Sequence, residues 1–328
     1  MPDLQTRTWA RSKRYLSVLA MSFAVLCMPT AQASQQRPLV LELNGQDKPL
    51  TEVSVNGVLT SALIDTGATI ALINDQLVSP DGASLVAGQE LEILGIGGSR
   101  NYPAIELSSL SVGTENWRNL PAALNTLDQF PVNDSVLPIS LFEQSIVDFD
   151  FRNDQILIYD GRPKRVRRSR TSSVRYNDQH RLIFIDVKIN GARGKALIDT
   201  GAQVSFVNLA FAEQSKAKLL TEDTKLIRGS DLNRHIASVY AFRNFEFANN
   251  RVAKPKFPVL ETDLFDDLGF ADQPMMIIGM DILQHCRLQV DRKRQRVTFV
   301  VPEKDAQRRL AETRDQKLTL DQRDRFQN

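Results

Sequence analysis

The chain has 328 residues, of which 42% are hydrophobic and 24% charged, which is enough apolar material for a packed core and about twice the length of one ordinary domain. This composition excludes collagen-like, coiled-coil and wholly disordered chains. The formal net charge is +2, from 41 basic and 39 acidic residues. A charge so close to zero lacks the strong basic excess of nucleic-acid-binding domains, so no nucleic-acid partner is expected.

Residues 1–33 have the pattern of a secretory signal peptide. A basic stretch ends at Arg14, an apolar run covers residues 15–28, and small residues for cleavage lie at 31–33. The apolar run, about 14 residues, is short for a membrane span of about 20; an uncleaved signal anchor is the alternative. We therefore expect an exported protein, periplasmic or secreted, with no stable membrane span after removal of the signal.

Four further segments are expected after the signal. They are a first lobe over residues 34–161, a basic linker over 162–180, a second lobe over 181–301 and a charged tail over 302–328. The linker is rich in arginine and is expected to be solvated; contact with an anionic lipid or polysaccharide, or proteolytic nicking, are the alternatives. The tail is nearly half charged and is expected to be a frayed helix or disordered.

The two lobes are expected because the sequence repeats itself. In residues 55–68, Val-Asn-Gly is followed by Ala-Leu-Ile-Asp-Thr-Gly-Ala, and the same order returns in residues 189–202 with one Val-to-Ile exchange. The offset is 134 throughout this stretch. After a small insertion it rises to 141, which aligns residues 136–139 with 277–280. A spacing held over so many positions indicates two tandem copies of one unit of about 120 residues.

The local patterns within each copy are mostly those of β-strands. An apolar strand ends in an Asn-Gly pair, at Asn56-Gly57 and at Asn190-Gly191, and this pair is a strong hairpin signal. A second apolar strand then leads to a turn that begins with aspartate. Short strands rich in β-branched or aromatic residues, at 155–159 and 296–300, close the two copies.

The residues suited to catalysis lie in this repeated turn. Asp65 and Asp199 each follow an apolar strand, so both carboxylates would be carried by rigid elements. Two carboxylates held about 3 Å apart cannot both ionise, which leaves one as a base and one as an acid. Such a pair can activate a water and protonate an attacked amide, and its titration belongs to the pair. The alternative is that both are structural turn residues inherited by duplication.

The sequence resembles the retropepsin-like aspartic proteases, in their bacterial exported branch, with two protease units fused in one chain as in the two-lobed pepsin arrangement. The resemblance rests on the apolar pair followed by Asp-Thr-Gly-Ala in both copies, and on Ile277-Ile278-Gly279 before a short helix. It implies a mainly β fold whose lobes form a bilobal cleft, and an aspartic endopeptidase with Asp65 and Asp199 as catalytic residues. It also implies that the loops are supported by Thr66, Gly67, Ala68, Thr200, Gly201 and Ala202. The threonines would bridge the loops, and the glycines would let backbone approach the shared water.

Members of this family also close a glycine-rich hairpin flap over the substrate. The candidates are Gly95, Ile96, Gly97 and Gly98 in the first copy and Gly229 in the second. Glycines permit the positive φ and the mobility that a lid needs, although any tight hairpin would use them. The first copy departs from the family pattern at one position, because Pro138 replaces the glycine that follows the apolar pair.

Other chemistries find little support. The three histidines lack metal-ligand spacing, no Gly-x-Ser-x-Gly occurs, and no dinucleotide-binding pattern follows Gly95. We therefore expect a peptide or protein substrate, with neither metal nor cofactor. A non-catalytic peptide-binding protein with a degenerate protease fold is the alternative function. A monomer is favoured, and a homodimer that pairs equivalent lobes of two chains is the alternative assembly.

Overall fold

The computed structural model describes residues 37–44, 48–78, 83–96, 98–126, 135–179, 181–228 and 234–302. The expected signal peptide, the charged tail beyond Pro302 and the flap candidates Gly97 and Gly229 lie outside these described residues. Within them, no helix is both long and apolar enough to cross a membrane.

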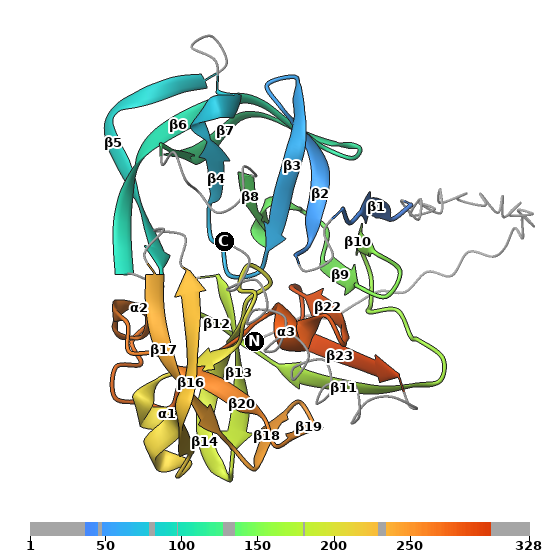
Figure 1. Cartoon of the computed structure of the whole chain (residues 1–328). Helices are drawn as coiled ribbons and strands as arrows, with labels where there is room; N and C mark the ends of the chain where they lie inside the picture. Colours follow the sequence, from blue (N-terminus) through green and yellow to red (C-terminus); the bar gives the residue numbers. More distant parts are fainter. Residues whose placement is uncertain are drawn as a thin grey trace, which may run out of the picture. The chain divides into compact units, whose positions relative to one another are not determined.

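The first sequence copy forms a seven-stranded sheet in the order β2-β3-β8-β4-β7-β6-β5 (Figure 1). Its strands are β2 (Leu50–Val55), β3 (Val58–Asp65), β4 (Ala71–Asn74), β5 (Ala83–Gly95), β6 (Gly98–Val112), β7 (Glu115–Asn125) and β8 (Ser135–Pro138). The long β5 and β6 form a hairpin that ends at Gly95 and Gly98.

The second copy forms a ten-stranded sheet in the order β16-β17-β20-β15-β21-β14-β13-β18-β19, with β12 paired to β13. Its strands are β12 (Asn177–Gln179), β13 (Leu182–Ile189), β14 (Ala192–Ile198), β15 (Phe206–Val207), β16 (Lys218–Arg228), β17 (Arg234–Ala241), β18 (Asn244–Phe247), β19 (Asn250–Ala253), β20 (Lys256–Val259) and β21 (Met275–Ile278). The hairpin β16–β17 is the counterpart of β5–β6.

The internal repeat is reproduced in the strand pairing. In each copy, the strand that leads to the aspartate pairs antiparallel with the strand before it and parallel with a later one. The parallel register matches Ile64 with Leu137 in the first copy and Ile198 with Ile278 in the second. These pairs are equivalent under the sequence offsets. The expectation of a mainly β fold built from two related units is confirmed.

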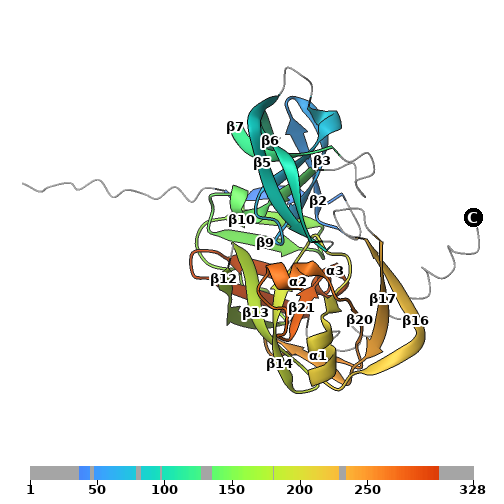
Figure 2. The ribbon, with the colours of Figure 1, turned by 90° about the vertical axis from the view of Figure 1, so that its left-hand side faces the viewer.

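A third sheet combines strands of both copies. Its six strands run in the order β1-β10-β9-β22-β23-β11, and Figure 2 shows β9 and β10 together in the side view. The bounds are β1 (Leu39–Glu42), β9 (Ile146–Asp150), β10 (Gln155–Tyr159), β11 (Ser169–Arg175), β22 (Arg287–Asp291) and β23 (Arg296–Pro302).

The described helical segments are short: η1 (Asp75–Leu77), η2 (Ile139–Leu141), α1 (Leu209–Gln214), α2 (Asp263–Asp267) and α3 (Met280–Leu283).

The segment expected as a solvated linker, residues 162–180, differs from that expectation. Strand β11 pairs antiparallel with β23 along its whole length, and β12 pairs with β13. Ser172 of β11 is buried against the sheet. The high density of arginine hid this strand, because an edge strand can make its backbone hydrogen bonds to one neighbour, here β23, while its charged side chains stay in water.

One continuous apolar core runs beneath both aspartate-bearing strands and reaches the third sheet. Ile64 and Ile198 are fully buried in the same cluster as Phe149 of β9 and Phe299 of β23. Protein interiors are packed at crystal-like density, so side chains in such a core have little freedom to shift. The core therefore fixes the two strand ends on which Asp65 and Asp199 depend.

A buried ion-pair network joins the two copies within the third sheet. Arg287 of β22 donates through Nε and Nη2 to the two carboxylate oxygens of Asp148 on β9, at 2.7 Å each. A third bond links Arg287 Nη1 to Asp150. Asp148 is fully buried, so its charge depends on this guanidinium for compensation.

Replacing Arg287 by Ala should destabilise the protein by about 3–5 kcal/mol, because Asp148 would remain buried without its partner. Chemical denaturation of the full chain measures this change. Arg251→Ala, at an exposed arginine of β19, is the matched control and should stay within about 0.5 kcal/mol of the parent protein. Equal stability of the two variants would show that the network does not hold the copies together.

Candidate active site

The two aspartate turns begin at the ends of buried strands. Asp65 is the last residue of β3, and Asp199 directly follows β14. The preceding residues, Ile64 and Ile198, are fully buried, and the backbone N–H of Asp199 donates to Ile278 O of β21 at 3.0 Å. Each carboxylate is therefore carried by a strand end that the core and a parallel neighbour hold in place.

Four reciprocal hydrogen bonds tie the two turns together. The Thr66 N–H donates to Thr200 Oγ1 at 3.0 Å, and the Thr200 N–H donates to Thr66 Oγ1 at 3.0 Å. Each hydroxyl then donates to the strand of the other copy: Thr66 Oγ1 to Ile198 O at 2.8 Å, and Thr200 Oγ1 to Ile64 O at 2.9 Å. Both threonines are buried, so these bonds satisfy groups that water cannot reach.

This arrangement brings the two carboxyl groups into contact. The Gly201 N–H donates to Asp65 Oδ1 at 3.1 Å and to Asp199 Oδ1 at 2.8 Å, so one backbone amide bridges both side chains. Gly67 N–H adds a bond to Asp65 Oδ1 at 2.7 Å, and Ala202 N–H adds one to Asp199 Oδ1 at 3.0 Å. The two carboxyl groups are close enough for each to shift the pKa of the other, and two carboxylates that share a buried site cannot both ionise.

The glycine after each threonine is required by this close approach. A Cβ atom on Gly67 would lie 2.6 Å from Asp199 Oδ1, and a Cβ on Gly201 would lie 2.4 Å from Asp65 Oδ2. Either contact is shorter than real Cβ atoms tolerate. Any larger residue would push the opposite aspartate out of the pair, which explains why both copies have Asp-Thr-Gly.

Burial raises the pKa of both aspartates. For Asp65, burial contributes most, and the charge of Asp199 raises the pKa further. For Asp199, burial again raises the pKa, while the amides of Ala202 and Gly201 and the interaction with Asp65 oppose the shift. The pair therefore keeps a proton to higher pH than an ordinary aspartate would, as expected when two carboxylates share one site.

In the second copy, a set of hydrogen bonds, here called the brace, joins the aspartate turn and the residues after it to the start of α3. The Gly279 N–H donates to Ser205 Oγ at 2.9 Å, and the Ser205 N–H donates to Asp281 Oδ1 at 2.8 Å. The Met280 N–H donates to Ala202 O at 2.8 Å, which ties the start of α3 to the loop that carries Asp199. Sequence reasoning missed Ser205 and Asp281.

The first copy lacks this brace. Pro138 stands at the position of Gly279 and has no N–H, while Ala71 stands at the position of Ser205 and has no hydroxyl. The first copy thus lacks both the N–H donor and the hydroxyl acceptor of the Gly279–Ser205 hydrogen bond, so neither group is left buried without its partner. Ser140 replaces Asp281, and the 3₁₀ helix η2 follows Pro138 in place of the α-helix α3. The sequence offsets could have revealed this difference, because an offset of 134 aligns Ala71 with Ser205 and an offset of 141 aligns Pro138 with Gly279.

The flap candidates of the first copy lie at the end of the β5–β6 hairpin. Gly95 pairs with Gly98, and Ile96 lies in the turn between them. Gly98 has φ +94°, a conformation that favours glycine.

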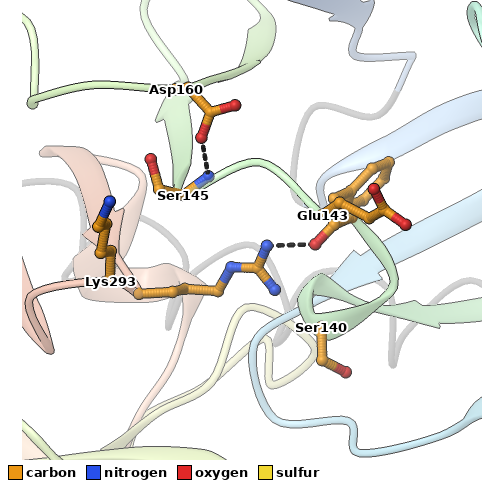
Figure 3. Close-up of a pocket in the computed structure, with 7 residues that line it drawn as sticks. Ser140, Glu143, Ser145, Asp160 and Lys293 are labelled. Carbon is orange, nitrogen blue, oxygen red and sulfur yellow. Dashed lines mark hydrogen bonds between the residues drawn. The ribbon is translucent and has the colours of Figure 1, made fainter.

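A cavity of about 610 Å³ is lined by residues outside the aspartate turns. It is lined by Ser140, Phe142, Glu143, Ser145, Asp160, Arg292 and Lys293. Figure 3 shows Asp160 accepting the hydrogen bond from Ser145 N, at 2.9 Å. None of the lining residues belongs to the aspartate loops, so this cavity is not the predicted site. Among the described residues, no group of three or more His, Cys, Asp or Glu is placed to hold a metal ion.

A mainly β chain with two related lobes and a paired Asp-Thr-Gly turn has the architecture of an acid protease. The model of the aspartyl protease family matches residues 51–141 and 185–282, together more than half of the chain. The chain therefore belongs to the aspartyl protease family. Each matched region contains one of the two aspartates. No curated protein is similar enough in sequence to match the chain.

Asp65→Asn should make the folded state more stable at pH 7 and should have little effect on stability at pH 3. The pKa of Asp65 is raised in the folded state. The protonated Asp65 side chain therefore contributes its full stability below the pKa of an unfolded aspartate, about 3.9. This contribution is lost as the pH rises toward the pKa of Asp65 in the folded protein. Thermal unfolding at several pH values measures this difference.

Asp272→Asn, at an exposed aspartate, is the control for the loss of one carboxylate and should change stability little at either pH. A stabilisation of Asp65→Asn that is equal at pH 3 and pH 7 would contradict the raised pKa.

Proposed function

We propose that the protein is an aspartic endopeptidase that hydrolyses peptide bonds with a water held between Asp65 and Asp199. The observation that carries this proposal is the bridging amide of Gly201, which bonds to both carboxylates. Because this amide holds the two carboxyl groups side by side, one water bound between them can contact a base and an acid at once. Membership in the aspartyl protease family supports the same chemistry.

The proposed reaction uses the single proton of the pair. The ionised carboxylate takes a proton from the water, whose oxygen attacks the amide carbon, while the protonated carboxyl gives its proton to the amide oxygen. In the second step, one carboxyl gives its proton to the leaving nitrogen while the other carboxylate takes the proton of one diol hydroxyl. The C–N bond breaks, an amine and a carboxylic acid are released, and the pair again holds its single proton. No bond forms between protein and substrate. The amides of Gly67 and Gly201 both donate to Asp65 Oδ1, and the Gly201 amide also donates to Asp199 Oδ1, which holds these two oxygens in place.

The substrate is proposed to be an extended segment of a peptide or protein. A cleft between β lobes suits a chain bound as a strand, which gains backbone hydrogen bonds and directs alternate side chains into pockets. We also infer that the enzyme works after export, in the periplasm or outside the cell, because the N-terminal segment has the pattern of a signal peptide. Both lobes of one site are proposed to come from one chain, as the Thr66–Thr200 bonds support.

Asp65→Asn and Asp199→Asn should each abolish turnover nearly as completely as the double variant, because residues that act as one catalytic unit are strongly non-additive. A fluorogenic peptide library at pH 4 to 6 measures turnover, and circular dichroism checks the fold. Substantial activity in both single variants, with loss only in the double variant, would instead indicate that like lobes pair between two chains.

Activity should fall as pH rises above the mildly acidic range, because the pair loses the proton that the attacked amide oxygen must receive. The pKa of Asp65 is raised by burial and by Asp199, so this loss should come at a higher pH than for an isolated aspartate. A pH–rate profile of kcat/KM tests this. A rate that climbs steadily to pH 9, or that EDTA abolishes, would point to another mechanism.

A non-catalytic peptide-binding protein is the second candidate. The observation that favours it is the missing brace in the first lobe, where Pro138 and Ala71 replace the bonded pair Gly279 and Ser205. A peptide with a statine-type centre, which mimics the tetrahedral intermediate, separates the two candidates. An endopeptidase should hydrolyse library peptides and be inhibited by the mimic; a binding protein should bind peptides without cleaving them.

A further inference from the structure

The hairpin of the first lobe is fastened to the second lobe. The hydroxyl of Thr262, just before α2, donates to the backbone O of Ile96 in the hairpin turn. Ser99 Oγ of β6 donates to Asp267 Oδ2 at the end of α2, at 3.3 Å. Strands β5 and β6 both pack against α2, and their lower ends lie near α2 in Figure 1.

Apolar side chains of the same hairpin cover a surface of the second lobe. Leu94 and Ile96 pack against a buried cluster that includes Leu197 and Ile277, on the strands β14 and β21. Ala202, in the loop of Asp199, packs against this cluster too. The hairpin turn therefore covers part of an apolar cluster against which Ala202 of the Asp199 loop also packs.

Thr262 has two tasks in this contact. Its hydroxyl accepts a hydrogen bond from Leu264 N at 3.0 Å and so caps α2, while the same hydroxyl donates to Ile96. Gly98 permits the close approach on the hairpin side, because a Cβ there would lie 3.2 Å from Asp263 Cβ. The second role of Thr262 needs a donor and the first needs only an acceptor, so substitutions can separate them.

We propose that this contact is a latch that holds the β5–β6 hairpin closed on the second lobe when no substrate is bound, with Thr262 as its positioning residue. An extended polypeptide enters by displacing Leu94 and Ile96 from the apolar surface, which selects segments that carry an apolar side chain there. The latch itself stands on the contacts above. Its effect on substrate entry rests on the proposed function.

A latched state lowers apparent affinity, because only the fraction of molecules with an open hairpin can bind. Removing one hydrogen bond of the latch should therefore lower KM roughly threefold to tenfold, while kcat changes less than about twofold. A residue that acted only by stabilising the lobe would not produce this split between KM and kcat.

Thr262→Asp and Thr262→Ser, compared in the full chain at pH 6, test the proposal. At that pH an aspartate is ionised, so the carboxylate introduced by Thr262→Asp can still cap α2 but cannot donate to Ile96, whereas a serine hydroxyl can do both. Amide hydrogen exchange of the hairpin segment that contains Leu94 should be at least about fivefold faster in Thr262→Asp. It should be unchanged in Thr262→Ser, and exchange in α2 should match the parent protein in both variants.

Hairpin exchange that is equal in Thr262→Asp and the parent protein would overturn the latch. Faster exchange in α2 by the same factor would overturn it as well, because Thr262 would then act only as a helix cap. A higher KM or a lower kcat in Thr262→Asp would contradict the role in substrate entry. If no variant hydrolyses any peptide, the proposed function fails, and the exchange measurements still decide whether the latch exists.

Discussion

The reciprocal hydrogen bonds between Thr66 and Thr200 are the interaction on which the site depends. They join the ends of two strands that belong to different sequence copies, and each hydroxyl reaches a backbone carbonyl of the other copy. Because the turns meet at this point, the carboxyls of Asp65 and Asp199 must face each other. The close approach then excludes any side chain at Gly67 and Gly201, and the burial that results raises the pKa of the pair.

The two copies retain the pairing scheme but have diverged around it. The second lobe braces its aspartate loop through Ser205 and Asp281, whereas the first lobe has lost the donor and the acceptor of that brace together. The first lobe instead sends its long hairpin across to α2. The two copies therefore differ in the hydrogen bonds behind the aspartate loop and in the described contacts of the β5–β6 hairpin.

Much of this could be predicted from the sequence because duplication leaves a signal that needs no structure. The offset of 134 identifies the paired turns. The parallel register Ile64–Leu137 and Ile198–Ile278 follows the two offsets, 134 for the first residue of each pair and 141 for the second. The contact of Thr262 with Ile96 could not be predicted, because it joins positions that the repeat does not relate. The same holds for Arg287 with Asp148 and for β11, whose arginines suggested a solvated linker. A contact between two single residues far apart in the sequence leaves no repeating pattern from which it could be predicted.

The central claim is that Asp65 and Asp199 share one proton, and a ¹³C NMR titration of the aspartate carboxyl carbons in the substrate-free protein tests it most directly. Asp65→Asn and Asp199→Asn provide the assignments. The expected result is two coupled steps felt by both carbons, with the second step well above the ordinary aspartate value of about 3.9. Two independent single steps near that value would contradict the claim, because they would show that the carboxyls neither repel each other nor share a proton.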